Sequence, residues 1–274
     1  MIYFWAGDES GWGIAMGSEP VIKTSEEIEK MRRAGRIVAV CLRKIREAAR
    51  PGVTGEELDA LADQTIRDCG GLPTFKGYGG FPANFCLSIN DEVVHGIPYG
   101  RVLKEGDVVG ADVGAVLEGY HADAAITFGV GEISAAAKRL IGVTKAALYM
   151  GIDQARAGKH VQDISRAIQK HVEKAGYSVV RDLVGHGIGR EMHEPPQVPN
   201  LVIGGKSPPL RVGMTLAIEP MVNMGDWKIW RKEDGWTYHT GDGSLSAHFE
   251  HCAAVTEKGP IVLTREDDLE TEAQ

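Results

Sequence analysis

Residues 50–71, RPGVTGEELDALADQTIRDCGG, and residues 156–176, RAGKHVQDISRAIQKHVEKAG, are two weakly similar stretches that decide the fold. They superimpose at a constant offset, which pairs Arg50 with Arg156, Gly52 with Gly158, Leu58 with Ile164, and Gly70 with Gly176. A single repeated pair is too short for a solenoid. The similarity therefore indicates an ancient duplication, with two related halves packed around a shared sheet.

Helix start and stop signals give each half a pair of helices. Thr24 with Glu27, and Thr54 with Glu57, have the spacing of a capping box, and apolar residues follow each box at helical intervals. The predicted helices run from residue 24 to near 51, from 54 to 70, from 134 to about 156, and from just after 158 to 176.

Strand-like segments follow each pair of helices, at residues 85–90, 108–116, 124–128, 214–218 and 249–255. Strands that alternate with paired helices indicate an α+β fold in a single domain over residues 22–274, preceded by a Gly-rich extension at residues 1–21. The prolines at 195, 196, 199, 208 and 209 predict a long irregular connection suited to the rim of a cleft.

Composition narrows the class of protein. The 274 residues are 43% hydrophobic, enough for a sizeable core, and 30 Lys and Arg stand against 38 Asp and Glu. A net charge of -8 without a basic block makes nucleic acid an unexpected partner. The four cysteines never form a CxxC pair, and no export signal or membrane span opens the chain, so we expect a cytoplasmic protein with reduced thiols.

Possible metal ligands sit on the predicted strands or at their ends, namely Asp112, Asp123, His186, Glu219 and Glu250. Asp112 interrupts an apolar strand, where an unpaired carboxylate would cost several kcal/mol. Each residue taken alone also fits a structural role: a buried carboxylate satisfied by Arg or Lys, a solvent-facing hairpin for Asp123, or a glycine turn for His186. Together, four carboxylates and one imidazole are typical ligands of two divalent cations.

A pair of such ions about 3.5–4 Å apart shares bridging carboxylates and a bridging water. The ions lower the pKa of that water from about 15.7 towards about 7, so that hydroxide is available at neutral pH. A nearby carboxylate can accept the proton. The ligand set therefore predicts a hydrolase.

The order and spacing of these residues, from about residue 22 to 264, resemble those of the type I methionine aminopeptidases. The matching segments are Asp112, Asp123, Gly185-His186-Gly187-Ile188-Gly189, Ile218-Glu219-Pro220, Phe249-Glu250-His251, Val94-His95-Gly96-Ile97-Pro98 and Met192-His193-Glu194-Pro195-Pro196. The resemblance implies the pita-bread fold, with two pseudo-symmetric halves around a central antiparallel sheet. It also implies removal of the initiator methionine from nascent chains, including those at the ribosome, by a monomer that prefers a small second residue.

By this resemblance Asp112 would chelate one ion, His186 and Glu219 the other, and Asp123 and Glu250 would bridge the two. The ions would be cobalt, manganese, iron or zinc, chosen by availability. Glu219 would carry the proton, His95 would hydrogen-bond the scissile amide and His193 would stabilise the oxyanion.

The methionine pocket implied by the resemblance comprises Phe75, Tyr78, Phe81, Cys86, Met192 and Trp236, together with His95 and His193. Many relatives carry a smaller cysteine in place of Phe75 and an aromatic residue in place of Met192. Gly114 and Ala124 stand where threonines are common. His248 replaces a glutamine, and on a strand it would share the face of Glu250.

Three alternatives fit parts of the pattern. An Xaa-Pro peptidase on the same fold shares the ligands but usually has a further N-terminal domain, for which this chain has no room. A pita-bread protein that only binds a partner would be expected to have lost its ligands. An oxygenase with one iron, two histidines and one carboxylate would leave the other carboxylates unexplained.

Overall fold

The computed structural model describes residues 19–265. The predicted extension at residues 1–21 therefore lies outside the described residues except for its last three positions.

All four predicted helices are present: α1 (Ser25–Ala48), α2 (Gly55–Asp68), α3 (Ala135–Ile152) and α4 (Val161–Lys174). Both capping boxes form, because Thr24 and Thr54 each accept a hydrogen bond from the backbone N–H of the glutamate three residues later, whose carboxylate accepts one in return. α3 ends several residues before the predicted position, and the segment up to Arg156 forms turns.

The chain between and after the helices contains strands joined by turns and loops. They are β1 (Leu72–Pro73), β2 (Cys86–Ile89), β3 (Glu92–Val94), β4 (Val108–Leu117), β5 (Tyr120–Gly129), β6 (Ser178–Val179), β7 (Val184–Gly187), β8 (Glu194–Pro199), β9 (Thr215–Ile218), β10 (Met221–Asn223), β11 (Ile229–Arg231), β12 (Tyr238–Thr240), β13 (Ser246–His248), β14 (Glu250–Thr256) and β15 (Gly259–Val262). One short 3-10 helix, η1 (Tyr78–Gly80), lies between β1 and β2.

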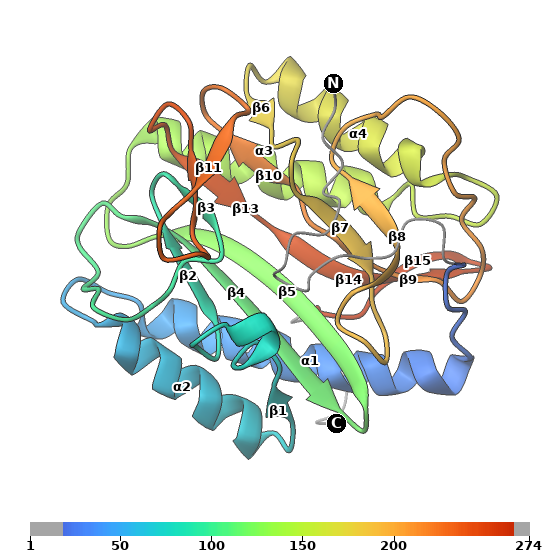
Figure 1. The fold of residues 1–274 in the computed structure, drawn as a ribbon, viewed down its shortest axis with the longest axis horizontal. Helices are drawn as coiled ribbons and strands as arrows, with labels where there is room; N and C mark the ends of the chain where they lie inside the picture. Colours follow the sequence, from blue (N-terminus) through green and yellow to red (C-terminus); the bar gives the residue numbers. More distant parts are fainter. Residues whose placement is uncertain (1–18, 266–274) are drawn as a thin grey trace.

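A curved antiparallel sheet forms the centre of the molecule (Figure 1). Its strands follow the order β1-β4-β5-β14-β9-β7-β8, while β2 pairs with β4 and β15 pairs with β14. β4 and β5 form a continuous hairpin paired from Val108 opposite Gly129 to Leu117 opposite Tyr120. The sheet thus joins a long hairpin from the first half of the chain to shorter strands from the second.

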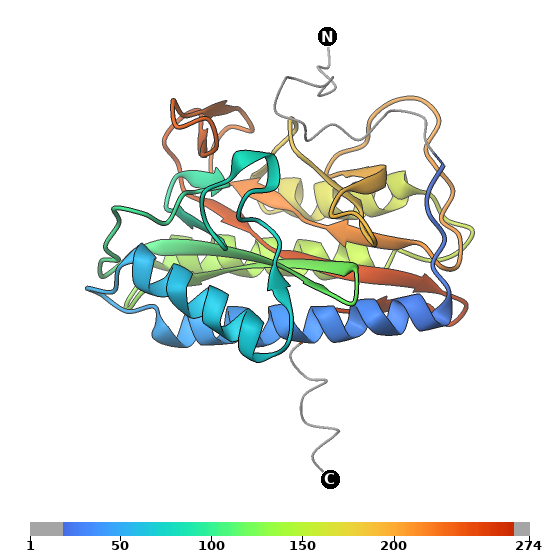
Figure 2. The same cartoon turned by 60° about the horizontal axis from the view of Figure 1, so that its bottom comes forward.

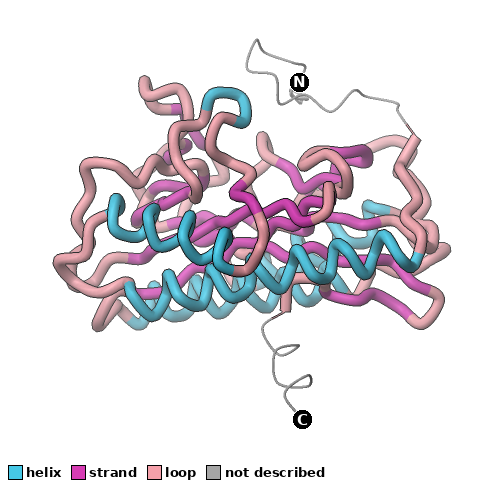
Figure 3. Tube along the Cα trace, turned by 90° about the horizontal axis from the view of Figure 1, so that it is seen from below, coloured by secondary structure: helices cyan, strands magenta, loops and turns pink. Residues whose placement is uncertain are grey.

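Each pair of helices covers its own part of the sheet. α1 and α2 pack with β4 and β5 in one apolar core, and α3 and α4 pack with β8 and β9 in another. In Figure 2 the helices α1 and α2 lie on the opposite side of the sheet from η1, and Figure 3, which views the sheet from its edge, shows the strands between these helices and η1. This confirms the predicted α+β fold with two related halves. None of the helices in the described part of the chain is long and apolar enough to cross a membrane.

The structure corrects one local expectation and excludes two of the alternative structural roles considered for the candidate ligands. Residues Glu194–Pro199, predicted as irregular, form strand β8, which lies at the end of the sheet where prolines are tolerated. His186 lies on strand β7 rather than in a turn. Strand β5 begins at Tyr120, so Asp123 lies within it and is buried rather than facing solvent.

Candidate active site

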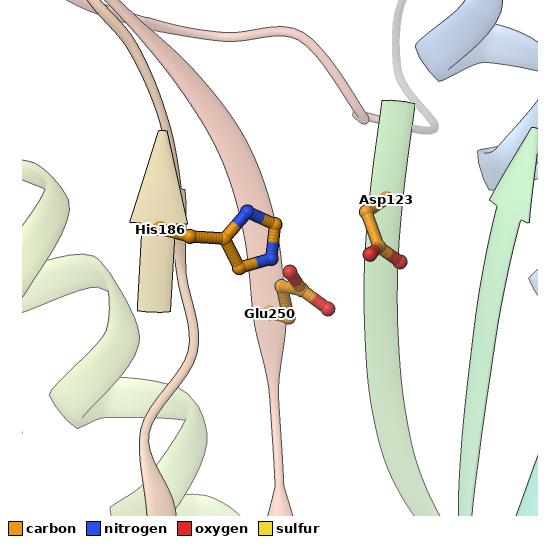
Figure 4. Close-up of side chains that lie close together, drawn as sticks. All are labelled: Asp123, His186 and Glu250. Atoms are coloured by element: carbon orange, nitrogen blue, oxygen red, sulfur yellow. The ribbon is translucent and has the colours of Figure 1, made fainter. Parts of the chain in front are cut away.

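One cavity at the centre of the sheet contains all five candidate ligands. It is lined by Phe75, Phe81, Cys86, His95, Asp112, Asp123, His186, His193, Glu219 and Glu250. Ligand atoms of Asp123, His186 and Glu250 all lie within 4.8 Å of one another. Figure 4 shows these three side chains extending toward one another from β5, β7 and β14.

Strand register explains why ligands distant in sequence converge. Asp112 of β4 pairs with Ala125 of β5, which in turn pairs with Glu250 of β14. Asp123 lies two residues from Ala125, and residues two apart on a strand share a face. These carboxylates therefore occupy one face of three adjacent strands, at spacings that long side chains can bridge.

The second half of the chain adds the imidazole and the fourth carboxylate. His186 pairs with Ala217 of β9, and Glu219 follows immediately after that strand. The Nε2 atom of His186 lies 3.6 Å from Oε1 of Glu219. Its Nδ1–H donates to the carbonyl of Gly187 at 2.9 Å, which fixes the tautomer and leaves Nε2 available as a ligand atom.

The cavity is electrostatically unfavourable for its own carboxylates. Burial, followed by repulsion from neighbouring carboxylates, raises the pKa of Asp112, Glu219 and Glu250 well above their usual values. Burial raises the pKa of Asp123 to about 7, although hydrogen bonds to Asp112 and to the backbone of Ala124 oppose the shift. Such a cluster is stabilised when cations neutralise it.

Unpartnered atoms also fit a metal site. One side-chain oxygen each of Asp112, Asp123 and Glu250 is buried and has no hydrogen-bond partner within residues 19–265. Buried polar atoms are rarely left unsatisfied in folded proteins. The donor set, oxygens with one imidazole nitrogen, suits divalent cations.

His248 is close to this cluster, although it ends β13 while Glu250 begins β14, so the two residues do not share one strand as expected. It is buried on β13, and its Nε2 lies 3.7 Å from Oε2 of Glu219. Burial lowers its pKa to about 3, so the ring is neutral. Glu219 therefore has an imidazole on each side.

An apolar cluster forms the other wall of the cavity. Phe75, Phe81, Cys86 and Met192 are buried, and Tyr78 and Trp236 pack against them. The ring of Phe81 lies edge-on to Phe75, with centroids 6.5 Å apart, and to Trp236, with centroids 5.2 Å apart. The six apolar residues named from the sequence thus form one cluster, which Ala83 and Ile97 complete.

Two further histidines face the cavity. The ring centroids of His193 and His186 are 4.3 Å apart, and Nδ1 of His193 lies 2.8 Å from the hydroxyl of Tyr78. Burial lowers the pKa of His95 to about 4, and burial with neighbouring histidines lowers that of His193 well below its usual value. Both rings are therefore neutral and able to donate one hydrogen bond each.

A buried ion pair supports the segment that carries His193. Lys23 and Glu194 are each about 5% exposed or less and contact each other directly. The carboxylate of Glu194 also accepts hydrogen bonds from the backbone N–H of Arg190 and Glu191. Sequence reasoning missed this pair, since Lys23 is close to Glu194 only in space.

A more open cleft of about 120 Å³ adjoins the inner cavity and shares His95, His186, His193 and Glu219 with it. Its outer part includes Asp182, Gln197 and Arg231. Sequence reasoning also missed these three residues. They come from separate segments without a shared motif, so no local signal could have identified them.

The geometry describes a metal cavity with an adjoining apolar pocket, and the comparison with known families agrees. The model of metallopeptidase family M24 matches residues 29–257. The chain belongs to metallopeptidase family M24. The family description accounts for the cluster of ligands, because a metallopeptidase depends on bound metal.

Relatives within family M24 are similar over most of the chain. The methionine aminopeptidase of Clostridium acetobutylicum is 52% identical over 245 residues, which span 89% of this chain and 98% of that relative. Methionine aminopeptidase 1 of Bacillus subtilis is 48% identical over 245 residues, covering 89% and 99% of the two chains.

Solved structures agree on the pita-bread fold. The structure of methionine aminopeptidase from Thermotoga maritima superimposes with a TM-score of 0.88 at 49% identity, covering 90% of this chain and 100% of that one. The prolidase of Pyrococcus furiosus, at 22% identity, superimposes with a TM-score of 0.74 over 90% of this chain and 66% of its own. The second likeness concerns the fold alone.

Proposed function

We propose that this protein acts as a methionine aminopeptidase of type I, which removes the initiator methionine from nascent proteins and peptides. One observation carries the proposal: a cluster of four carboxylates and His186 shares a buried cavity with a closed apolar pocket. Hydrolysis requires the first, and selection of an unbranched thioether side chain requires the second. The methionine aminopeptidases at about 50% identity support it further.

The candidate ligands would hold two divalent cations. Asp112 would contribute to one ion, His186 and Glu219 to the other, and Asp123 and Glu250 to both. The raised pKa values of the four carboxyl groups support this division, because one cation would leave much of the negative charge unbalanced. When bound, the ions acidify a water molecule and polarise the scissile carbonyl. Cobalt, manganese, iron and zinc all suit this ligand set.

Glu219 accepts the proton of the attacking water and returns it to the leaving amine. Its carboxylate lies within 3.7 Å of both His186 and His248, which restrict its position. In the metal-free protein burial and the charge of Asp123 raise its pKa, and a bound cation would oppose this shift.

His193 donates a hydrogen bond to the substrate carbonyl, and His95 hydrogen-bonds the scissile amide. For His193 to donate from Nε2, its Nδ1 must accept a hydrogen bond, and the hydroxyl of Tyr78 at 2.8 Å is placed to donate it. Tyr78 therefore orients His193 in addition to lining the pocket. A donor aimed at a developing oxyanion is typically worth about 2.7–4 kcal/mol.

The bound polypeptide extends from the inner cavity through the open cleft. Its first side chain occupies the apolar pocket, and the following backbone passes between His95, His193 and Trp236. Close approach there favours a small second residue. Through this cleft the N-terminal segments of nascent chains reach the active site as they emerge from ribosomes in the cytoplasm. The enzyme acts on them as a monomer.

The deciding experiment uses protein loaded with Mn²⁺ or Co²⁺ and three peptides, Met-Ala-Ser, Met-Arg-Ser and Ala-Pro-Ser. We expect free methionine from the first, much less from the second, and no cleavage of the third. The D112N variant serves as a control for a contaminating peptidase. Cleavage of Ala-Pro-Ser alone would assign the protein to the Xaa-Pro peptidases, and inertness of metal-loaded protein towards all three would leave a binding protein.

A further inference from the structure

Gly114 occupies a position where a side chain would point into the active-site cavity. It lies two residues after Asp112 on β4, and residues two apart on a strand face the same side. Its partner across the hairpin is Asp123. A glycine at this point of a well-paired strand leaves room beside two candidate metal ligands.

The ring of Phe75 fills that room. A Cβ atom added to Gly114 would lie 2.6 Å from Cε1 and 3.1 Å from Cδ1 of Phe75. Non-bonded carbon atoms pack at about 3.5–4.0 Å, so a side chain at 114 and the present position of the ring exclude each other. Phe75 and Gly114 are therefore matched in shape.

The position of Phe75 also bears on the rest of the pocket wall. Its side chain is buried, with the residue 5% exposed, and its ring lies at 88° to that of Phe81. Phe81 in turn contacts Trp236 at 78°. If the ring of Phe75 were displaced, it would enter the pocket or push against Phe81 and Trp236. The dense packing leaves few other positions for the ring.

We propose that Phe75 and Gly114 together set the depth of the pocket for the first residue of the substrate. Gly114 seats the ring against β4, and the seated ring closes the pocket at a length that admits methionine but not a longer side chain. The inference rests on the proposed function, because it concerns the pocket assigned there. It assigns Gly114 a role in substrate selection, and this role depends on the absence of a side chain at position 114.

The test must separate Phe75 from a second neighbour of Gly114. The added Cβ would also lie 2.4 Å from Oγ1 of Thr74, a buried atom with no hydrogen-bond partner among the described residues. T74A removes this contact without breaking a side-chain hydrogen bond. It therefore serves as the parent, and its activity should lie within about threefold of the unaltered protein, as expected of a substitution that breaks no catalytic contact.

Four proteins form a double-mutant cycle: T74A, T74A/F75A, T74A/G114A and T74A/F75A/G114A. The readouts are kcat and KM for Met-Ala-Ser and for the peptide in which S-ethylhomocysteine, one methylene longer, replaces methionine. One methylene in an apolar pocket changes kcat/KM by about tenfold or more. Metal content and the Kd of free methionine and free S-ethylhomocysteine are measured on the same samples.

We expect T74A/F75A to raise the preference for the longer substrate at least about tenfold, because the end of the pocket opens. T74A/G114A should raise KM for Met-Ala-Ser about tenfold or more at unchanged metal content, because its methyl group drives the ring into the pocket. In the triple variant the methyl group enters vacated space. Its KM should therefore return to within about threefold of T74A/F75A, which gives strong non-additivity.

Three results would overturn the pairing: an unchanged chain-length preference in T74A/F75A, a harmless T74A/G114A substitution, or additive effects around the cycle. Should T74A/G114A fail to fold, a triple variant that folds would support the pairing, because removal of the ring relieves the clash, and a triple variant that also fails while T74A/F75A folds would overturn it. Unaltered metal-loaded protein that cleaves neither peptide would contradict the proposed function. The Kd values for the two free amino acids would then still test the pairing.

Discussion

The two walls of the active-site cavity are built in different ways. The ionisable wall stands on paired strands, with Asp112, Asp123 and His186 within β4, β5 and β7. The apolar wall comes mainly from connecting segments, with Phe75 and Phe81 between β1 and β2, and Trp236 between β11 and β12. Cys86, on β2, is the exception.

The difference assigns catalysis to the ionisable wall and substrate selection to the apolar wall. Strand pairing fixes the direction of each ligand, and metal geometry tolerates little variation. Connecting segments tolerate substitution more readily than a sheet does, so a pocket built on them can change its shape while the ligands keep theirs. Substitutions in the two walls should therefore give distinct combinations of kcat, KM and metal content.

The largest effect is expected on the ionisable wall. D112N should lower kcat/KM by about a thousandfold or more, since metal activation and carbonyl polarisation contribute several kcal/mol. Metal content, measured by mass spectrometry, should fall in parallel. D63N, on the outer surface of α2, is the matched control and should leave both quantities unchanged. Normal metal content in inactive D112N would argue against its role as a ligand.

Replacement of His193 should affect the reaction without affecting the metal. H193A is expected to lower kcat by about 10²–10³-fold, the usual cost of one oxyanion donor. Metal content should match that of the unaltered protein. Parallel loss of metal and activity would instead place His193 among the ligands.

Tyr78 belongs to the apolar wall by position and to the ionisable wall by its hydrogen bond. Y78F should lower kcat about tenfold, because the hydroxyl no longer selects the tautomer of His193. KM should change little, since the ring remains. Y99F, which removes a tyrosine hydroxyl that donates to Asp59 and to the carbonyl of Pro82, is the control. A change confined to KM would show that Tyr78 only shapes the pocket.

The smallest expected effect concerns stability. Without metal, the ionisable wall holds carboxyl groups whose folded pKa values exceed their unfolded values, that of Asp123 reaching about 7. The folded state then binds more protons than the unfolded state, so the free energy of unfolding falls as pH rises. Above about pH 7, unfolded histidines with their usual pKa of about 6.5 are largely neutral and contribute little.

Thermal unfolding of metal-free protein should therefore begin at lower temperature at about pH 8 than at about pH 7, and Mn²⁺ should reverse the trend because metal binding displaces protons. The shift should be smaller in D112N, which removes one of these groups. In F81L, whose side chain does not ionise, it should persist. A flat profile in the unaltered protein would mean that the carboxyl groups are already balanced.

Local signals made much of this structure predictable. Thr24 and Thr54 carry complete capping boxes within four residues, and Asp112 stands out because it interrupts an apolar run. Strands β7 and β8 could not be recognised, since glycines around His186 and prolines after Glu194 are typical of turns. They are strands because neighbouring strands pair with them, and that information is not local.

The residues of the cleft show more clearly that sequence patterns reveal only local relationships. The two-residue period of a strand predicted that His248 and Glu250 share a face of one strand. They lie on different strands, β13 and β14, yet His248 lies 3.7 Å from Glu219. Asp182, Gln197 and Arg231 line the open cleft from three separate segments. Nothing in their sequence surroundings relates them, because only the folded sheet and its loops bring them together.

The ends of the central sheet bear on how the protein behaves at high concentration. An exposed sheet edge can template pairing with another molecule and so start aggregation. Here one end is β1, two residues long and containing Pro73, and the other is β8, which contains Pro195, Pro196 and Pro199. Proline has no N–H to donate, so the strand ladder is difficult to extend from β1 or from β8, which disfavours edge-to-edge association at these two strands.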